Sequence, residues 1–363
     1  MADLPATPSP RRFRVETNAR PLVIAGLAAV ALVLIVLPVF AGRAALQDFF
    51  FIFTMLALAQ YWNLLAGYAG LVSVGQQAFV GLGAYSLFAA TLLAGLDPFV
   101  AILISGVVAA ALALPTALVV FRLRGAYFAI GTWVAAEVFR LVFAQFKQLG
   151  GGTGTSLGPD IANSLAGLEW VARTFGVRNS AARDIITYWV ALALLIGTLT
   201  LVYALLRSRR GLALAAIRDS EPAADSLGVD GFRTKLVVYV LTAFGTGMVG
   251  ALIYFQKARI SPDAAFSVFD WTAYVIFIVV IGGIGTMEGP IVGAIVLYFL
   301  QDYLASFGAW YLIALGGLAA AVMLVAPQGL WGFFARWSDF QVFPVRRRLS
   351  TPDRDDHSPA GSR

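Results

Sequence analysis

Long stretches without charged side chains are the feature that most restricts how this chain can fold. Several of them run for about 20 residues, the length at which a helix crosses a hydrocarbon core of roughly 30 Å. Of the 363 residues, 60% are hydrophobic and 13% are charged, and the mean hydropathy is +0.81. Soluble domains carry about 25% charged residues. The sequence therefore predicts an all-α integral membrane protein, and the alternation typical of a membrane β-barrel is missing.

We predict ten transmembrane helices with both termini in the cytoplasm. This orientation places most of the Lys and Arg residues on the cytoplasmic side, in line with the charge bias of membrane proteins. An even number of spans keeps both basic tails on that side. The predicted spans are 21–41, 46–66, 71–94, 98–121, 125–146, 185–206, 234–256, 269–286, 289–305 and 308–326.

The spans form one polytopic domain over residues 21–326. The tails, residues 1–20 and 327–363, are rich in Pro, Ser and Arg or Asp, and this composition is typical of disordered segments. The loop at 147–184 contains QLGGGTGTSLGPDI and is expected to be a flexible external loop that contacts a partner or a substrate. The loop at 207–233 is expected on the cytoplasmic side.

The composition argues against several kinds of chemistry. The chain has no Cys, and its one His, His357, lies in the C-terminal tail. Disulfides, thiolate chemistry and the usual zinc sites are therefore not expected, and we predict no metal and no cofactor. The net charge of +6 does not indicate nucleic-acid binding, because the basic residues lie mainly at the ends of apolar runs, where they orient helices.

Two glycine-rich stretches resemble each other. They are NLLAGYAGLVSVGQQAFVGLGAY at residues 63–85 and IVVIGGIGTMEGPIVGAIVL at residues 278–297. The likeness predicts a weak internal two-fold repeat, which is common among transporters. Glycine at membrane depth also lets a helix break where the freed backbone groups face protein or water. Close helix packing across small residues explains the same glycines equally well.

Polar side chains inside the apolar runs are candidates for a solute path. Such a path could be lined by Gln60, Asn63, Ser73, Gln76 and Gln77, although hydrogen bonding between helices is an equally good explanation. Glu137 lies near the middle of its span, where a charge costs roughly 2.5–3.5 kcal/mol. Arg140 is one turn away, so we expect an i,i+3 ion pair or a path lining rather than proton coupling.

The polar stretch SRRGLALAAIRDSEPAADSLGVD, residues 208–230, lies between two long apolar runs. Ser220 is placed to cap a short helix, with Glu221 in its first turn. Leu227 ends this helix, and Gly228 supplies the stop. A solvated linker needs neither caps nor a face rich in Leu and Ala. We therefore expect one or two short cytoplasmic helices that bind a protein partner.

This loop resembles the coupling loop of binding-protein-dependent ABC importer permeases. Glu221, Ala223, Ala224, Gly228 and Val229 stand at the E-x-A-A…G-V/I positions of that motif. Over most of residues 45–326 the chain also resembles the LivM-type permeases of branched-chain amino-acid importers. The other matching segments are the first glycine-rich stretch, LRGAYFAIGTWVAAEVFR, RISPDAAF and VVIGGIGTMEGPIVGA.

The resemblance implies a multi-pass subunit of a bacterial-type inner membrane that imports branched-chain amino acids or a related small polar solute. It implies a second permease, two cytoplasmic ATP-binding subunits and an extracytoplasmic solute-binding protein as partners, beside the lipid bilayer. Together with the predicted start and end of the short helix, it indicates that the residues that couple to the ATPases are Ser220, Glu221, Ala223, Ala224, Leu227 and Gly228.

The chain has no Walker A motif, so we expect it not to be an enzyme and expect separate subunits to supply the energy for transport. An ion-coupled secondary transporter is the alternative, because that class also uses repeats and broken helices.

Overall fold

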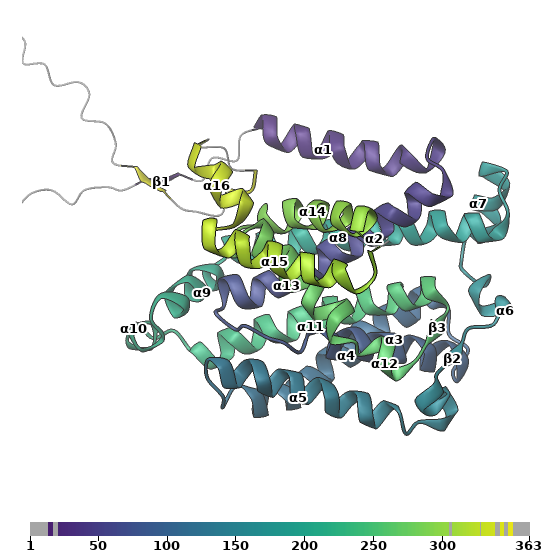
Figure 1. Ribbon diagram of the computed structural model, residues 1–363, viewed down its shortest axis with the longest axis horizontal. Helices are drawn as coiled ribbons and strands as arrows, with labels where there is room; N and C mark the ends of the chain where they lie inside the picture. The colour runs from purple at the N-terminus through teal and green to yellow at the C-terminus, as the bar shows by residue number, and fades with distance from the viewer. Residues whose placement is uncertain are drawn as a thin grey trace, which may run out of the picture.

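The computed structural model describes residues 14–16, 21–304, 307–326, 328–337, 342–344 and 348–350. Most of them belong to a bundle of helices that run roughly along one direction (Figure 1). The longer helices are α1 (Pro21–Val36), α2 (Arg43–Asn63), α3 (Gln76–Leu92), α4 (Pro98–Val120), α5 (Ala126–Phe143), α8 (Asn179–Arg207), α11 (Gly231–Lys257), α14 (Gly289–Leu304) and α15 (Ala309–Val325).

Shorter helices connect or extend them. These are η1 (Leu37–Val39), η2 (Leu64–Tyr68), η3 (Lys147–Leu149), η4 (Gly151–Thr153), α6 (Pro159–Ala162), α7 (Leu168–Phe175), α9 (Arg209–Asp219), α10 (Glu221–Ser226), α12 (Pro262–Ala265), η5 (Phe269–Ala273), α13 (Tyr274–Gly282) and α16 (Gly329–Trp337). The short strands β1 (Arg14–Glu16) and β4 (Arg348–Ser350) form one antiparallel pair, and β2 (Thr155–Ser156) and β3 (Arg259–Ile260) form another.

The prediction of an all-α membrane protein is confirmed. Within the described residues, seven helical segments are long and apolar enough to cross a membrane. Each predicted span overlaps an apolar helix, but α1, α3 and α14 have only 16 or 17 residues. The total of ten spans, the cytoplasmic termini and the two-fold repeat stay predictions.

Two predicted spans have wrong boundaries for the same physical reason. The third span was expected from residue 71, but α3 begins at Gln76, because Gly70 takes a left-handed backbone with φ of +69°. The eighth was expected to reach residue 286, but α13 ends at Gly282. Gly283 and Gly285 follow it with positive φ values of +132° and +75°, which other residues rarely adopt.

Two segments contain more structure than expected. The loop at 147–184 contains β2, α6 and α7, and its far part already belongs to α8. In the C-terminal tail, α16 packs against α13, α14 and α15 because its sequence GLWGFFARW is apolar and aromatic. The remainder of both tails lies almost entirely outside the described residues.

The helix α11 lies at the centre of the bundle and packs against α2, α3, α4 and α8. Glycines make its closest approaches possible. A Cβ atom on Gly83 of α3 would overlap the carbonyl of Gly247, and one on Gly250 would lie 2.7 Å from the Cα atom of Val80. Small residues therefore bring these helices into backbone contact, as is usual for helix packing in membranes.

The two ends of the bundle carry different elements (Figure 1). One end carries α9 and α10, together with the beginning of α1 and with α16; we call it the α10 end. The other carries α6, α7 and the β2–β3 pair and is called the α7 end. The placement of the loops 147–184 and 207–233 on opposite sides of the membrane stays a prediction.

Candidate functional site

The predicted coupling loop begins with a helix, α9, that packs against α8 and α11. Ser208 accepts a hydrogen bond from the backbone N–H of Arg210 at 3.1 Å and so caps α9. A Cβ atom at Gly211 would overlap the carbonyl of Leu206, so the sharp turn from α8 into α9 requires glycine. Leu214 and Ile217 are buried, and burying side chains of this size stabilises by about 1.5–3 kcal/mol each.

The second helix of the loop, α10, is exposed by comparison. Leu227 follows it with 81% of its surface exposed, whereas Ala224 is buried against the rest of the loop. Gly228 has φ of +80°, as expected for the residue that stops a helix. The carboxylate of Glu221 pairs with Lys235 of α11 at 2.6 Å, which holds the first turn of α10 to the bundle.

The capping role expected for Ser220 is only half correct. Ser220 occupies the N-cap position of α10, but its hydroxyl makes no capping hydrogen bond. Its backbone is extended, with φ of −161° and ψ of 107°, and it is the only residue between α9 and α10. Ala223 is exposed beside it. The six residues predicted for coupling therefore lie together in one protrusion at the α10 end.

The first glycine-rich stretch does break a helix, as its sequence predicts. After η2, residues 69–75 turn and run back along α2, where Trp62 donates its indole N–H to the carbonyl of Ser73 at 2.7 Å. The backbone N–H of Val74 donates to the hydroxyl of Thr132 at 3.1 Å. These freed backbone groups thus bond to protein, the condition for a helix break at membrane depth.

The two glycine-rich stretches meet at one place, which we call the Gly67–Gly285 junction. Asn63 donates to the carbonyl of Thr286 at 2.8 Å and accepts from the N–H of Gly285 at 2.8 Å. Gln60, one turn earlier, donates to the carbonyl of Met287 at 2.7 Å. A Cβ atom on Gly67 would lie 2.6 Å from the nitrogen of Gly285. The junction therefore closes only because Gly67 lacks a side chain, and Gly285 takes a positive φ of +75° that favours glycine.

The other polar residues predicted to line a path are also buried. Gln76 donates to Thr246 of α11 at 2.8 Å, and Gln77 interacts with Thr272 of η5 through both its backbone N–H and its side-chain carbonyl. The hydroxyl of Ser73 accepts from the N–H of Gly75 at 3.1 Å. In this conformation all five predicted path residues thus bond to protein. Gln76 and Gln77 bond to other helices, Gln60 and Asn63 bond to the turn after α13, and Ser73 bonds within its own turn.

Glu137 lies apart from these residues, on an exposed face of α5. Its carboxylate pairs with Arg140 at 2.6 Å, so the expected i,i+3 ion pair is present. The guanidinium of Arg140 also pairs with Asp263 of α12 at 2.6 Å. The side chains of Glu137 and Arg140 are 46% and 28% exposed. Sequence analysis missed Asp263, because residues 123 positions apart give no local signal.

A further cluster missed by sequence analysis fixes the α7 end. The carboxylate of Asp184, at the first turns of α8, pairs with Arg43 and accepts from Gln256 of α11 at 2.7 Å. The amide of Gln47 in α2 donates to the same carboxylate at 3.4 Å. Asp184 is only 2% exposed. One buried carboxylate thus joins α2, α8 and α11.

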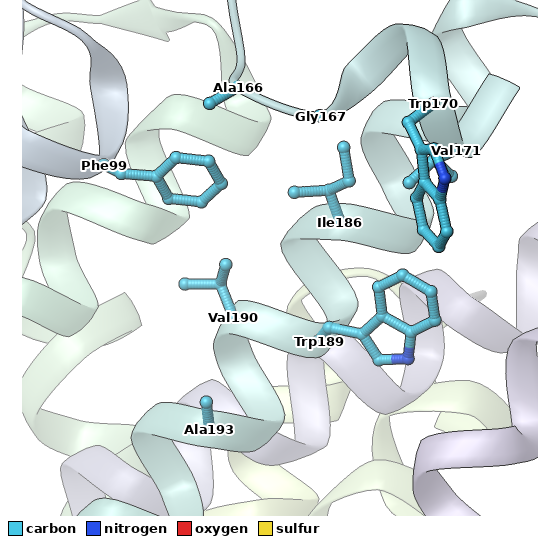
Figure 2. Close-up of a pocket in the computed structure, with 9 residues that line it drawn as sticks. All are labelled: Phe99, Ala166, Gly167, Trp170, Val171, Ile186, Trp189, Val190 and Ala193. Atoms are coloured by element: carbon cyan, nitrogen blue, oxygen red, sulfur yellow. The ribbon is translucent and has the colours of Figure 1, made fainter.

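A hollow of about 320 Å³ lies between α4, α7 and α8 at the same end. Figure 2 shows Phe99 and Trp170 on opposite sides of Ile186, with Trp189 below them. The lining side chains are apolar or aromatic, so the hollow does not suit a polar solute. Among the described residues, no group of three or more His, Asp or Glu side chains is arranged to hold a metal ion.

The chain matches one protein family over most of its length. The sequence model described as "Branched-chain amino acid transport system / permease component" matches residues 42–327. No solved structure matches the chain significantly.

Curated relatives agree with this match. The high-affinity branched-chain amino acid transport system permease proteins LivM of Salmonella typhimurium and Escherichia coli are each 31% identical over 279 residues. The alignments cover 74% of this chain and 65% of each relative, so the chain spans about two thirds of their length. The probable branched-chain amino acid transport permease protein LivH of Methanocaldococcus jannaschii is 26% identical over 156 residues, covering 40% of this chain and 47% of that protein.

Proposed function

Because the chain belongs to the family of branched-chain amino acid transport system permease components, we propose that it is a permease subunit of an ABC importer. It is a multi-pass protein of the inner membrane. In the proposal it moves branched-chain amino acids, or a related small polar solute, into the cell. Separate subunits hydrolyse the ATP, an extracytoplasmic protein binds the solute, and a second permease completes the path.

The observation that carries this proposal is the protrusion formed by α9 and α10. Its inner helix is anchored by buried Leu214 and Ile217, whereas Leu227 is presented to the surroundings with 81% of its surface exposed. An ATPase subunit could bind the exposed apolar side chain, and the anchored helix would transmit its movement to the bundle. In the proposed orientation the α10 end faces the cytoplasm, where ATP is available.

The exposed face of α5 supports a second permease subunit as partner. Helix α1 also lies at the edge of the bundle, but residues 21–36 contain no charged side chain and suit lipid. In contrast, Glu137 and Arg140 are partly exposed on α5, and charges at this depth rarely face lipid. We therefore place the second permease, and the solute path between the two subunits, along α5.

The buried polar residues have a role in this path only when the junction opens. In the described conformation Asn63, Ser73, Gln76 and Gln77 bond to protein. Separation of η2 from the turn at 283–288 would free the amide of Asn63 first. We propose that these groups then contact the passing solute, while Glu137 lines the entrance beside α5.

The alternative of an ion-coupled secondary transporter has less support. Such a transporter needs a charged or carbonyl-rich ion site, and a proton-coupled one needs a carboxylate that gains and loses a proton. Glu137, which lies near the middle of its predicted span, already pairs with Arg140, which also binds Asp263. Glu137 is therefore not the lone carboxylate that proton coupling needs.

Reconstitution tests the proposal directly. Vesicles that contain this chain, the second permease and both ATPases are supplied with binding protein and ATP, and uptake of labelled leucine is measured with isoleucine, valine, urea and an amide as competitors. We expect ATP-dependent uptake that valine and isoleucine reduce. Strong competition by urea or the amide would indicate that the transported solute is of that class and not a branched-chain amino acid. Uptake by this chain alone, driven by a proton gradient, would instead establish the secondary transporter.

A further inference from the structure

A single side chain connects the coupling loop to the place where the two glycine-rich stretches meet. Arg218 lies in the last turn of α9, and its Nη1 atom donates to the carbonyl of Gly67 at 2.8 Å. These two residues are 151 positions apart in the sequence. The helix α9 also packs against η2, which contains Gly67.

The same guanidinium borders both sides of the Gly67–Gly285 junction. Its Nη1 atom lies 3.2 Å from the position that a Cβ atom on Gly285 would take. Arg218 is thus in contact with the end of η2 and with the turn that follows α13. Any side chain on Gly285 would crowd this guanidinium, so the absence of a side chain there leaves room for it.

The chemistry of the contact makes it stronger than an ordinary surface hydrogen bond. Gly67 is in the last turn before the helix break, where backbone carbonyls lack partners within the helix. A cation at the C-terminal end of a helix is also favoured by the helix dipole. Hydrogen bonds from a charged donor are roughly twice as strong as neutral ones. Among the described residues, no ion pair with a carboxylate competes for the guanidinium of Arg218.

The connection between α10 and Arg218 is short and stiff. Ser220 alone separates α9 from α10, and α10 is fixed by the Glu221 to Lys235 pair and by the hydrogen bond from Val229 N–H to the carbonyl of Ala224 at 3.1 Å. Arg218 is two residues before Ser220. Less than one turn of helix therefore separates Arg218 from α10, so a displacement of α10 would also move the guanidinium of Arg218.

We propose that Arg218 is the positioning residue that transmits movement of the α9–α10 protrusion to the Gly67–Gly285 junction. This inference rests on the proposed function, because it requires ATPases that move α10. When α10 is pushed, Arg218 shifts the Gly67 carbonyl relative to Gly285 and loosens the hydrogen bonds that Asn63 makes across the junction. The contact then acts as the link between ATP hydrolysis and opening of the gate.

The test uses the complete reconstituted transporter with Arg218→Gln. Three quantities are measured separately. They are the amount of assembled complex, the rate of ATP hydrolysis without binding protein, and the amount of solute moved per ATP hydrolysed. We expect assembly and basal hydrolysis to be retained, while solute moved per ATP falls about tenfold, within the range of typical coupling between sites. Arg218→Lys keeps a charged donor and should recover part of the loss. Arg210→Gln makes the same substitution at an exposed position of α9, and this variant should transport normally.

Each other outcome is decisive. Normal solute moved per ATP in Arg218→Gln would overturn the inference and leave the proposed function intact. If Arg218→Gln does not assemble, Arg218→Met, which keeps the length of the stem, replaces it, and a low ratio in this variant supports the inference. Failure of both variants to assemble would make Arg218 a purely structural residue and would also overturn it. Absence of uptake by the unsubstituted complex would overturn the proposed function itself.

Discussion

The two ends of the bundle are held together by different means. At the α7 end, the buried carboxylate of Asp184 joins three helices through charged and polar side chains. At the α10 end, the Gly67–Gly285 junction is closed by backbone contact and by the side-chain amide of Asn63. The Arg218 guanidinium also donates to the Gly67 carbonyl, but the hydrogen bonds that cross the junction from Asn63 are neutral, and neutral hydrogen bonds are weaker than those to a charged group. We therefore propose that the α7 end is fixed and that the α10 end moves.

The largest combined effect, on the amount of folded protein and on uptake, is expected from Gly67→Ala. The new methyl group would lie 2.6 Å from the nitrogen of Gly285, and such overpacking costs about 1–3 kcal/mol. Because backbone atoms cannot rotate away, the junction must open, and both uptake and the amount of folded protein should fall. Heating followed by size-exclusion chromatography, together with uptake, measures both.

The matched control is Gly197→Ala in the middle of α8. A Cβ atom there meets nothing within 4 Å, and its backbone is not left-handed. It should behave like the natural protein. Equal effects of Gly67→Ala and Gly197→Ala would show that close backbone contact at the junction is not required. The proposed difference between the two ends of the bundle would then have no support.

Glu221→Lys should abolish uptake but leave the protein in the membrane. The substitution replaces the pair with Lys235 by two facing ammonium groups at the base of α10, so the protrusion loses its position. Uptake by the reconstituted complex and the amount of protein in the membrane are compared. The same change at the α7 end, Glu169→Lys, removes only an ion pair with both partners more than 80% exposed. Normal uptake by Glu221→Lys would argue against coupling through this helix.

Asp184→Ala tests the same comparison at the α7 end of the bundle. The substitution removes hydrogen bonds to a charged group. Each such bond contributes about 1.5–3 kcal/mol to the free energy of unfolding, so the midpoint of thermal unfolding should fall. Uptake per assembled complex should remain near normal, because the α7 end does not move in this account. Asp160→Ala, at an exposed position of the same end, serves as the control. A loss of uptake without a loss of stability would place moving parts at the α7 end.

The smallest effect separates two serines of the coupling loop. Ser208→Ala removes a cap that bonds to Arg210 N–H and should destabilise α9 by about 1 kcal/mol. Ser220→Ala removes a hydroxyl that makes no capping bond and should leave thermal stability unchanged. Hydrogen exchange of the α9 amides reports the difference. Equal protection in the two variants would contradict the assignment of the caps.

Local signals in the sequence predicted most of this architecture. Apolar length predicted the helices, the position of Gly228 predicted the end of α10, and spacing predicted the pair between Glu137 and Arg140. These features depend on residues within a few positions of each other. For the same reason Ser220 was correctly placed at the start of a helix, although its hydroxyl is not used.

Contacts between distant segments were not predictable in this way. The bond from Arg218 to Gly67, the Asp184 network and the role of Asp263 join residues on different helices, and no spacing rule relates them. Sequence reasoning recognised both glycine-rich stretches, but only the structure shows that they touch. The buried state of Gln76 and Gln77 also follows from their partners Thr246 and Thr272, which lie far along the chain.

Labelling of one introduced thiol tests the central claim, that an external motor binds the α9–α10 protrusion. The chain has no Cys, so Leu227→Cys supplies a unique and exposed reactive group. Trp170→Cys, at a residue 65% exposed at the α7 end, is the reference. We predict that a maleimide labels both variants rapidly in the permease alone, and that binding of the ATPases slows labelling at position 227 only. Unchanged labelling at position 227 in the assembled complex would contradict the account.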